Sequence, residues 1–147
     1  MAMVDAYPLP EIDSVSAPFW EAAGRGELRM QACAVCGALR FPPRPMCPWC
    51  RSLDDEWRLM SGRGTVWSFV VPHPPLLPAF MPLAPYNVVV VALDEEPTLR
   101  MVGNLVASPA GPINEIDPAT IEIGQPVRVV FQRLADDVNL PRWVPAS

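Results

Sequence analysis

The chain has 147 residues, half of them hydrophobic, which suits one compact domain or a small module joined to a single core. Its net charge is −5, so it lacks the basic surface that indicates a nucleic-acid-binding protein. Twenty prolines and eight glycines stay below the share at which disorder becomes the expectation.

The sequence shows neither the charged and apolar regions of a signal peptide nor an apolar run near the roughly 18 residues of a membrane-spanning helix. Its cysteines are paired in short motifs, which fits metal binding in a reducing compartment better than disulfides in a secreted protein. We therefore predict a cytoplasmic protein without a membrane span. A start at Met1 favours a free-standing subunit over a domain of a longer chain.

Residues 1–15 contain prolines and little periodicity, and we expect an extended arm there. A short helix should follow over residues 18–23, with Ser16 as its cap and Gly24 and Gly26 ending it.

Phe19 and Trp20 make this helix strongly apolar for its length. Two interpretations stay open for these aromatic side chains. They pack on the chain's own core, or they anchor the helix to a partner protein.

All four cysteines form two C-x-x-C pairs, Cys33/Cys36 and Cys47/Cys50, separated by ten residues. Two such pairs supply the four thiolates of a tetrahedral zinc site, and Gly37 with the prolines after it suits a compact return of the chain. Two disulfides and a redox-active C-x-x-C are the alternatives, although a redox pair usually begins a helix. Four thiolates leave no open position on the metal, so we predict a structural zinc.

Strands are expected on both sides of the cysteines, over residues 28–32 and 56–60, which pair to complete a zinc ribbon. Its core would be very small, so metal binding would supply much of its folding free energy.

The remainder of the chain has the short apolar runs and turn signals of a small barrel. We predict strands over residues 64–71, 86–93, 99–105, 127–134 and 139–144, with a short helix or turn at 118–123. The expected fold is mainly β: an arm and helix (1–25), a zinc ribbon (26–61) and a five-stranded OB-fold barrel (62–147).

A proline-rich loop over residues 72–85 carries several large apolar side chains and no charge apart from that of His73. Loops usually run over the surface, so these side chains need something to bury them. They either fold back to close the barrel, or line an acyl-chain site or a protein interface. The residues are Leu76, Leu77, Phe80, Met81 and Leu83.

No catalytic constellation stands out. His73 is the only histidine, no G-x-S-x-G motif is present, and the cysteines are assigned to zinc. The chain is therefore expected to have no catalytic residues of its own.

Four segments carry a resemblance to a known family. They contain the motifs FW, CxxCG, FPPRxxCPxC and GRGTV in this order, and lie between residues 18 and 145. The chain resembles the zinc-ribbon/OB-fold proteins long catalogued as domain of unknown function thirty-five. The segments are FWEAAGRGELRMQACAVCGALRFPPRPMCPWC, SGRGTVWSF, PYNVVVVALDEEPTLRMVGNLV and IGQPVRVVF.

The resemblance implies an N-terminal helical segment, a rubredoxin-like zinc ribbon and an OB-fold barrel. It also implies a non-catalytic subunit that assembles with a thiolase-like protein, an aldolase or a MaoC-like hydratase and helps hold a CoA thioester. A domain of this kind pairs with a thiolase-like retro-aldolase that cleaves a steroid side-chain acyl-CoA. The family's zinc ligands correspond to Cys33, Cys36, Cys47 and Cys50.

Two hypotheses follow. In the first, the chain is an accessory subunit in a hetero-oligomer, with Arg44, Arg63 and His73 as candidate contacts to the CoA thioester. Its partner interface would be formed by Phe19, Trp20, Leu76, Leu77, Phe80 and Met81. In the second, it is a nucleic-acid-binding module, because zinc ribbons and OB barrels recur in such proteins, but eleven arginines against sixteen acidic residues argue against it.

Overall fold

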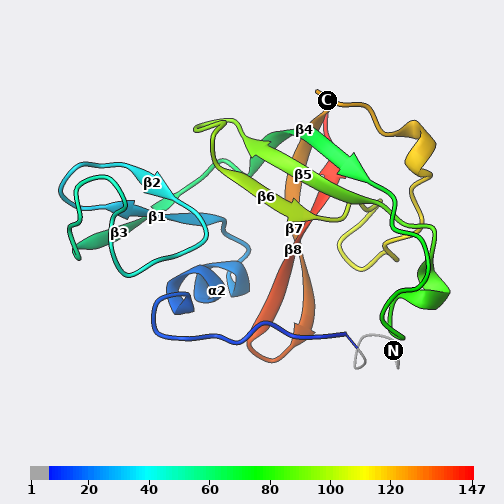
Figure 1. Ribbon diagram of the computed structural model, residues 1–147, viewed down its shortest axis with the longest axis horizontal. Helices are drawn as coiled ribbons and strands as arrows, with labels where there is room; N and C mark the ends of the chain where they lie inside the picture. The colour runs from blue at the N-terminus through cyan, green and yellow to red at the C-terminus, as the bar shows by residue number, and fades with distance from the viewer. Residues whose placement is uncertain (1–6) are drawn as a thin grey trace.

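The computed structural model describes residues 7–147, which form a small three-stranded sheet, a larger five-stranded sheet and one α-helix (Figure 1). The elements in chain order are α2 (Ala17–Gly24), β1 (Arg29–Cys33), β2 (Leu39–Arg40), β3 (Asp55–Leu59), β4 (Arg63–Val70), a 3-10 turn (Met81–Leu83), β5 (Val88–Leu93), β6 (Arg100–Gly103), a 3-10 turn (Pro118–Thr120), β7 (Pro126–Ala135) and β8 (Val138–Pro145). The predicted fold class, mainly β with a short N-terminal helix, is confirmed.

Helix α2 lies where a short helix was predicted, but its N-terminal cap differs from the prediction. The side chain of Ser16 caps no α2 amide. Instead, the N–H of Ser16 donates to Asp13 Oδ1 at 2.8 Å, and the N–H of Asp13 donates to Ser16 Oγ at 3.2 Å. This reciprocal pair resembles a capping box that begins one turn earlier, at Asp13. At the other end, Glu27 and Gly26 donate to the carbonyls of Ala22 and Ala23, the two bonds of a Schellman motif.

The three-stranded sheet has the order β2-β1-β3, with both pairs antiparallel. Strands β1 and β3 pair from Arg29↔Leu59 to Cys33↔Asp55, which confirms the predicted partnership of the strands on both sides of the cysteines. Strand β2 was not predicted. It has only two residues and is defined by its pairing with β1.

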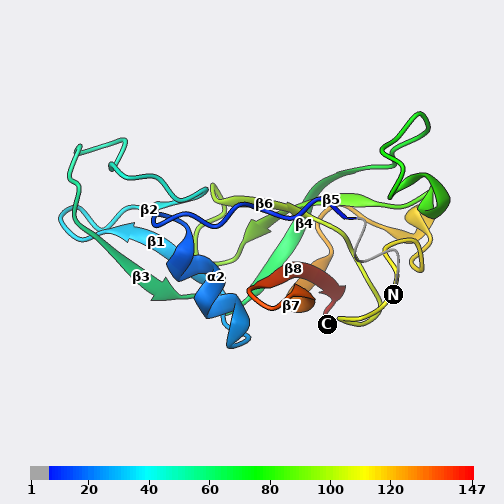
Figure 2. The same cartoon turned by 90° about the horizontal axis from the view of Figure 1, so that it is seen from below.

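The five-stranded sheet has the order β6-β5-β4-β7-β8 and is antiparallel throughout. The five predicted strands correspond to these five elements. The sheet curls into an open, OB-like half-barrel rather than a fully paired barrel (Figures 1 and 2). Near its open edge, the segment after β6 meets β8 in a parallel bridge, Leu105↔Trp143, with the Val106 N–H donating to the Trp143 carbonyl at 2.7 Å.

A buried asparagine ties the segment after β6 to the chain just before β5. Asn87 is fully buried, and its amide donates to the carbonyl of Leu105 at 2.9 Å while accepting from the Leu105 N–H at 2.6 Å. Asn104 Nδ2 in turn donates to the Asn87 carbonyl at 2.6 Å. The Asn87 side chain thus takes the place of a backbone pairing partner where regular strands end.

One hydrophobic core joins the zinc ribbon to the half-barrel. It contains Phe19 of α2, Met30 of β1, Val91 of β5 and Trp143 of β8, all buried. Figure 2 shows α2 between the ribbon and the β7–β8 hairpin. Phe19 is only 5% exposed and packs on the chain's own core, the first of the two interpretations left open for it; its contact with a partner stays a prediction. Trp20 is half-buried against the same core.

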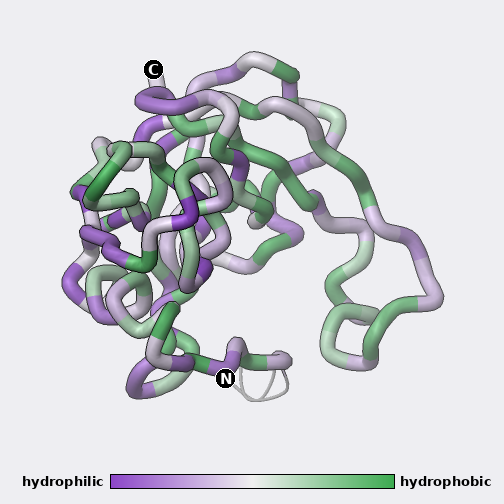
Figure 3. The backbone as a smooth tube through the Cα atoms, turned by 60° about the vertical axis from the view of Figure 1, so that its left-hand side comes forward, coloured by the Kyte–Doolittle hydropathy of each residue, from purple (hydrophilic) through white to green (hydrophobic). Residues whose placement is uncertain are grey.

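The proline-rich loop after β4 projects from the end of the half-barrel far from the ribbon (Figure 1), and hydrophobic residues continue into it (Figure 3). Leu76, Phe80 and Leu83 pack against a second buried cluster that includes Tyr86. Leu77 is 60% exposed and Met81 43%. The loop therefore folds back with part of its apolar surface and presents the rest to solvent.

None of the helices in the described part of the chain has the length and apolarity that crossing a membrane requires.

Candidate metal centre

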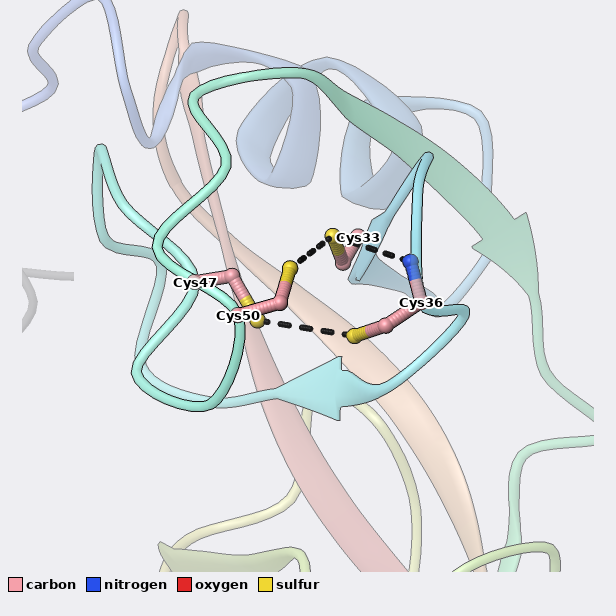
Figure 4. A group of neighbouring side chains, drawn as sticks. All are labelled: Cys33, Cys36, Cys47 and Cys50. Atoms are coloured by element: carbon pink, nitrogen blue, oxygen red, sulfur yellow. Dashed lines mark hydrogen bonds between the residues drawn. The ribbon is translucent and has the colours of Figure 1, made fainter.

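The fold brings all four cysteines together at the end of the ribbon. Cys33 ends β1, Cys36 lies in the turn that follows, and Cys47 and Cys50 lie in the loop before β3. Their sulfur atoms lie within 4.8 Å of one another and face a common centre (Figure 4).

The spacing of the sulfurs fits a metal site and not disulfides. Cys33 Sγ lies 3.4 Å from Cys50 Sγ, and Cys36 Sγ lies 3.7 Å from Cys47 Sγ. A disulfide would need about 2.05 Å. Four thiolates around zinc, each with a bond of about 2.3 Å, stand about 3.8 Å apart in a tetrahedron. Both of these contacts join cysteines of different pairs, whereas a redox C-x-x-C would join the two within one pair.

The two C-x-x-C turns repeat the same backbone hydrogen bonds. In the first, Gly37 donates to the Cys33 carbonyl and Cys33 donates to Ala38; in the second, Arg51 donates to the Cys47 carbonyl and Cys47 donates to Ser52, all at 2.9 Å. Gly37 and Arg51 occupy equivalent positions, and both have a positive φ, 78° and 65°. The paired turns thus have nearly the same shape although their sequences differ.

Backbone amides point at the first sulfur of each pair. The N–H of Cys36 and that of Val35 each lie 3.4 Å from Cys33 Sγ, and the Cys36 N–H is the larger cause lowering the pKa of Cys33 to about 6. The N–H groups of Cys50 and then Trp49 lower the pKa of Cys47 in the same way. Backbone N–H groups that donate hydrogen bonds to a sulfur stabilise its thiolate form, and the thiolate is the form that binds metal.

The crowding of the sulfurs opposes full ionisation without a cation. The backbone N–H of Ser52 favours the Cys50 thiolate, yet the sulfur of Cys33 and then burial raise the pKa of Cys50 to about 11. Four thiolates this close repel one another unless a positive ion neutralises them. A divalent metal fits both the spacing and the charge of the cluster.

Buried polar residues that the sequence did not single out hold the chain between the two cysteine pairs. Gln31 Nε2 donates to Asp55 Oδ2 at 2.6 Å and to the Arg44 carbonyl at 2.9 Å, and its Oε1 accepts from the Arg44 N–H at 2.8 Å. Arg40, 1% exposed, donates to the same carbonyl from Nη2 at 2.9 Å. The loop is therefore fixed by the body of the ribbon.

The candidate CoA contacts do not form one site. Arg44 lies in the loop between the cysteine pairs, and Arg63 begins β4, whereas His73 follows the far end of that strand. The eight residues of β4 alone extend for about 25 Å. All three side chains are exposed, so each is accessible to a ligand on its own surface.

Two family models match the chain. The first is described as "ChsH2, rubredoxin-like zinc ribbon domain" and matches residues 20–56. The second is described as "ChsH2, C-terminal OB-fold domain" and matches residues 57–132. A zinc ribbon with four clustered cysteines supports a structural zinc.

The curated proteins that are similar in sequence include hydratase alpha subunits and DUF35 scaffold proteins. A "Probable enoyl-CoA hydratase alpha subunit" of Thermomonospora curvata is 40% identical over 95% of this chain, and the "3-oxo-4,17-pregnadiene-20-carboxyl-CoA hydratase alpha subunit" of Mycobacterium tuberculosis is 35% identical over 95%. The chain spans only 40% and 39% of the lengths of these two proteins. A "DUF35 domain-containing scaffold protein" of Methanothermobacter thermautotrophicus is 35% identical over 77% of each chain.

A solved structure described as "Ltp2-ChsH2(DUF35) aldolase" contains a similar chain. The identity is 39%, the TM-score is 0.78, and the match covers 94% of this chain and 99% of the other.

Proposed function

Because this chain belongs to the ChsH2 (DUF35) family of zinc-ribbon and OB-fold proteins, we propose that it is a non-catalytic accessory subunit of a thiolase-like enzyme that acts on an acyl-CoA thioester. One observation carries this proposal. The chain matches nearly the whole length of a similar chain in a structure named for an aldolase and its DUF35 component.

In this role the zinc is structural. Cys33, Cys36, Cys47 and Cys50 hold it with four thiolates, and no ligand position remains for water or substrate. When bound, the ion neutralises the thiolates and joins two turns of the ribbon. Since the ribbon shares a core with the half-barrel, the ordered ribbon also supports the surface that a partner would meet.

The exposed part of the proline-rich loop is the best-supported docking segment. Leu77 and Met81 are large, apolar and solvent-accessible, while their neighbours Leu76 and Phe80 fix the loop to the half-barrel. Such a loop needs little ordering on binding, because its prolines and its packed neighbours already restrict it. Trp20 of α2 is half-buried, and the accessible part of its side chain is a second candidate contact.

We assign the contacts to the CoA thioester to exposed basic side chains. Arg44 or Arg63 would approach the CoA phosphates from the ribbon and the start of β4, and His73 would contact substrate beside the docking loop. The substrate class we propose is an acyl-CoA with a bulky apolar acyl group, such as a steroid side-chain thioester.

We assign the chemistry of the reaction to the partner and the ordering of the site to this chain. The partner supplies the nucleophile, the acid and base, and the oxyanion donors. This chain supplies a rigid surface that orders the partner's active-site loops and keeps water away from the thioester.

A hydratase is the second candidate partner, because two similar proteins are named as hydratase alpha subunits. Both are more than twice as long as the matched segment, so their hydratase activity need not reside in it. In this case the chain would assemble with a MaoC-like hydratase instead of a thiolase-like enzyme.

The test is turnover of an acyl-CoA by the partner with and without this subunit. We expect the complex to cleave or condense the thioester, and the partner alone to lose activity or solubility. Leu77→Asp with Met81→Asp should weaken the complex, whereas Ile123→Asp, a matched change at a residue 68% exposed elsewhere on the half-barrel, should not. Unchanged thioester binding and turnover without the subunit would refute the accessory role.

A further inference from the structure

A pocket of about 390 Å³ lies apart from the metal centre, between helix α2, strands β6 and β8, and the segment around Tyr7. Its walls are mainly apolar. They include Phe19 and Trp20 of α2, Phe41 from the ribbon, Met101 of β6 and Leu140 of β8. Concave apolar sites of this size with few polar groups are typical of small-molecule binding.

A buried cation lines this apolar pocket. Arg142 of β8 is 4% exposed, and its Nε donates to Gln132 Oε1 at 3.1 Å while its Nη1 donates to Asn104 Oδ1. Both acceptors are neutral amides. Among residues 7–147 no carboxylate forms an ion pair with Arg142, and its Nη2 donates no hydrogen bond.

The neighbours of Arg142 hold the guanidinium in place but do not neutralise it. Asn104 is itself fixed, since its Nδ2 donates to the Asn87 carbonyl. Burial lowers the pKa of Arg142, and the nearby Tyr7, which also lines the pocket, acts in the opposite direction. A desolvated cation without a counter-ion is costly, and a planar guanidinium is suited to bind a carboxylate with two parallel bonds.

The pocket contains a second group that is able to donate. Tyr86 is buried and lines the pocket, and its hydroxyl forms no hydrogen bond with the described residues. Burial raises the pKa of this hydroxyl, so it stays protonated and remains a donor at neutral pH.

We propose that this pocket binds an apolar monocarboxylate, with the hydrocarbon body against Phe19, Trp20 and Leu140 and the carboxylate on Arg142. One guanidinium matches a single carboxylate, whereas a phosphate monoester or the CoA phosphates would call for more cationic groups than the pocket provides. The proposal concerns the chain alone and does not depend on the partner enzyme, so the two fail independently.

The test is isothermal titration of the zinc-loaded chain with decanoate, and with decanol as the uncharged probe of equal chain length. We expect saturable binding of decanoate at one site and binding of decanol at least about tenfold weaker, the difference that a charge-assisted hydrogen bond makes. Zinc content is measured before and after titration, to exclude binding of the carboxylate at the metal.

Three substitutions locate the site. Arg142→Gln should weaken decanoate binding at least about tenfold and leave decanol unchanged, while Arg142→Lys keeps the charge and should recover part of the loss. Arg128→Gln removes the same charge from an exposed position on β7 that lies outside the pocket, and should have no effect. Circular dichroism and zinc content identify any variant that fails to fold.

Leu140→Trp keeps Arg142 and fills the apolar part of the pocket, so it should abolish binding of both probes even if Arg142→Gln does not fold. The proposal is wrong if decanoate does not bind at millimolar concentration, if decanol binds equally well, or if Leu140→Trp leaves decanoate binding intact.

Discussion

Replacing Arg51 with glycine should stabilise the zinc-loaded protein. Arg51 has a φ of 65°, in the left-handed region, at the position equivalent to Gly37 in the other cysteine turn. That conformation costs an L-residue roughly 1–2 kcal/mol, and folding costs glycine about 0.5–1 kcal/mol in conformational entropy. The difference between the midpoints of these two costs gives an expected gain of about 0.8 kcal/mol, within a range of about 0–1.5 kcal/mol. The Arg51 side chain is exposed, so its removal should add little to this difference.

Gly37→Ala should have the opposite effect. A Cβ at Gly37 would meet the Arg58 guanidinium at 3.5 Å, an ordinary contact, so the cost is conformational and about 1 kcal/mol. Urea denaturation at fixed free zinc measures both changes. Arg51→Ala is the control and should be nearly neutral, because alanine pays the same left-handed cost. A loss of stability in Arg51→Gly similar to that in Gly37→Ala would refute the reasoning.

Other perturbations test the half-barrel, the metal and the helix cap. Asn87→Leu should cost about 2–4 kcal/mol in urea denaturation, because it leaves the buried N–H and carbonyl of Leu105 unpaired; a loss below 1 kcal/mol would contradict this. Cys47→Ser, or chelation of the metal, should unfold the ribbon and lower the melting temperature, and a folded ribbon without metal would argue against a structural ion. Zinc should be released as pH falls from 7 to 5, because protons compete for the thiolates, and metal retained at pH 5 would count against four thiolate ligands. Asp13→Ala should lower the melting temperature at pH 7, because the Asp13 carboxylate accepts a hydrogen bond from the Ser16 N–H, which holds the pKa of Asp13 below its ordinary value. An unchanged melting temperature would show that Asp13 does not cap the helix.

The strands were predictable because their signals are local. The run over residues 86–93 is almost wholly apolar and became β5, which is buried along most of its length. The cysteine spacing likewise predicted a cluster, since each C-x-x-C turn is built from its own backbone bonds. The boundaries 1–25, 26–61 and 62–147 remain predictions.

The features that could not be predicted from the sequence depend on contacts that only the folded chain brings together. Gln31 reads as an ordinary polar residue of a strand, and only the fold places it between Asp55 and Arg44. Asp13 lies four residues before the helix, and its capping interaction consists of reciprocal hydrogen bonds with Ser16. Arg142 lies between a proline and a buried tryptophan. An arginine in an otherwise apolar strand is a local sign of an unusual site, because charged side chains are seldom buried without a partner.

The most direct test of the accessory-subunit account is the mass of the species formed with a partner. The chain is co-expressed with a thiolase-like protein encoded at the same locus, purified through a tag on the partner, and weighed by light scattering. The account predicts a stable zinc-containing hetero-oligomer, much heavier than the 16.2 kDa chain, that contains both proteins. A zinc-loaded monomer that does not associate with the partner would contradict it.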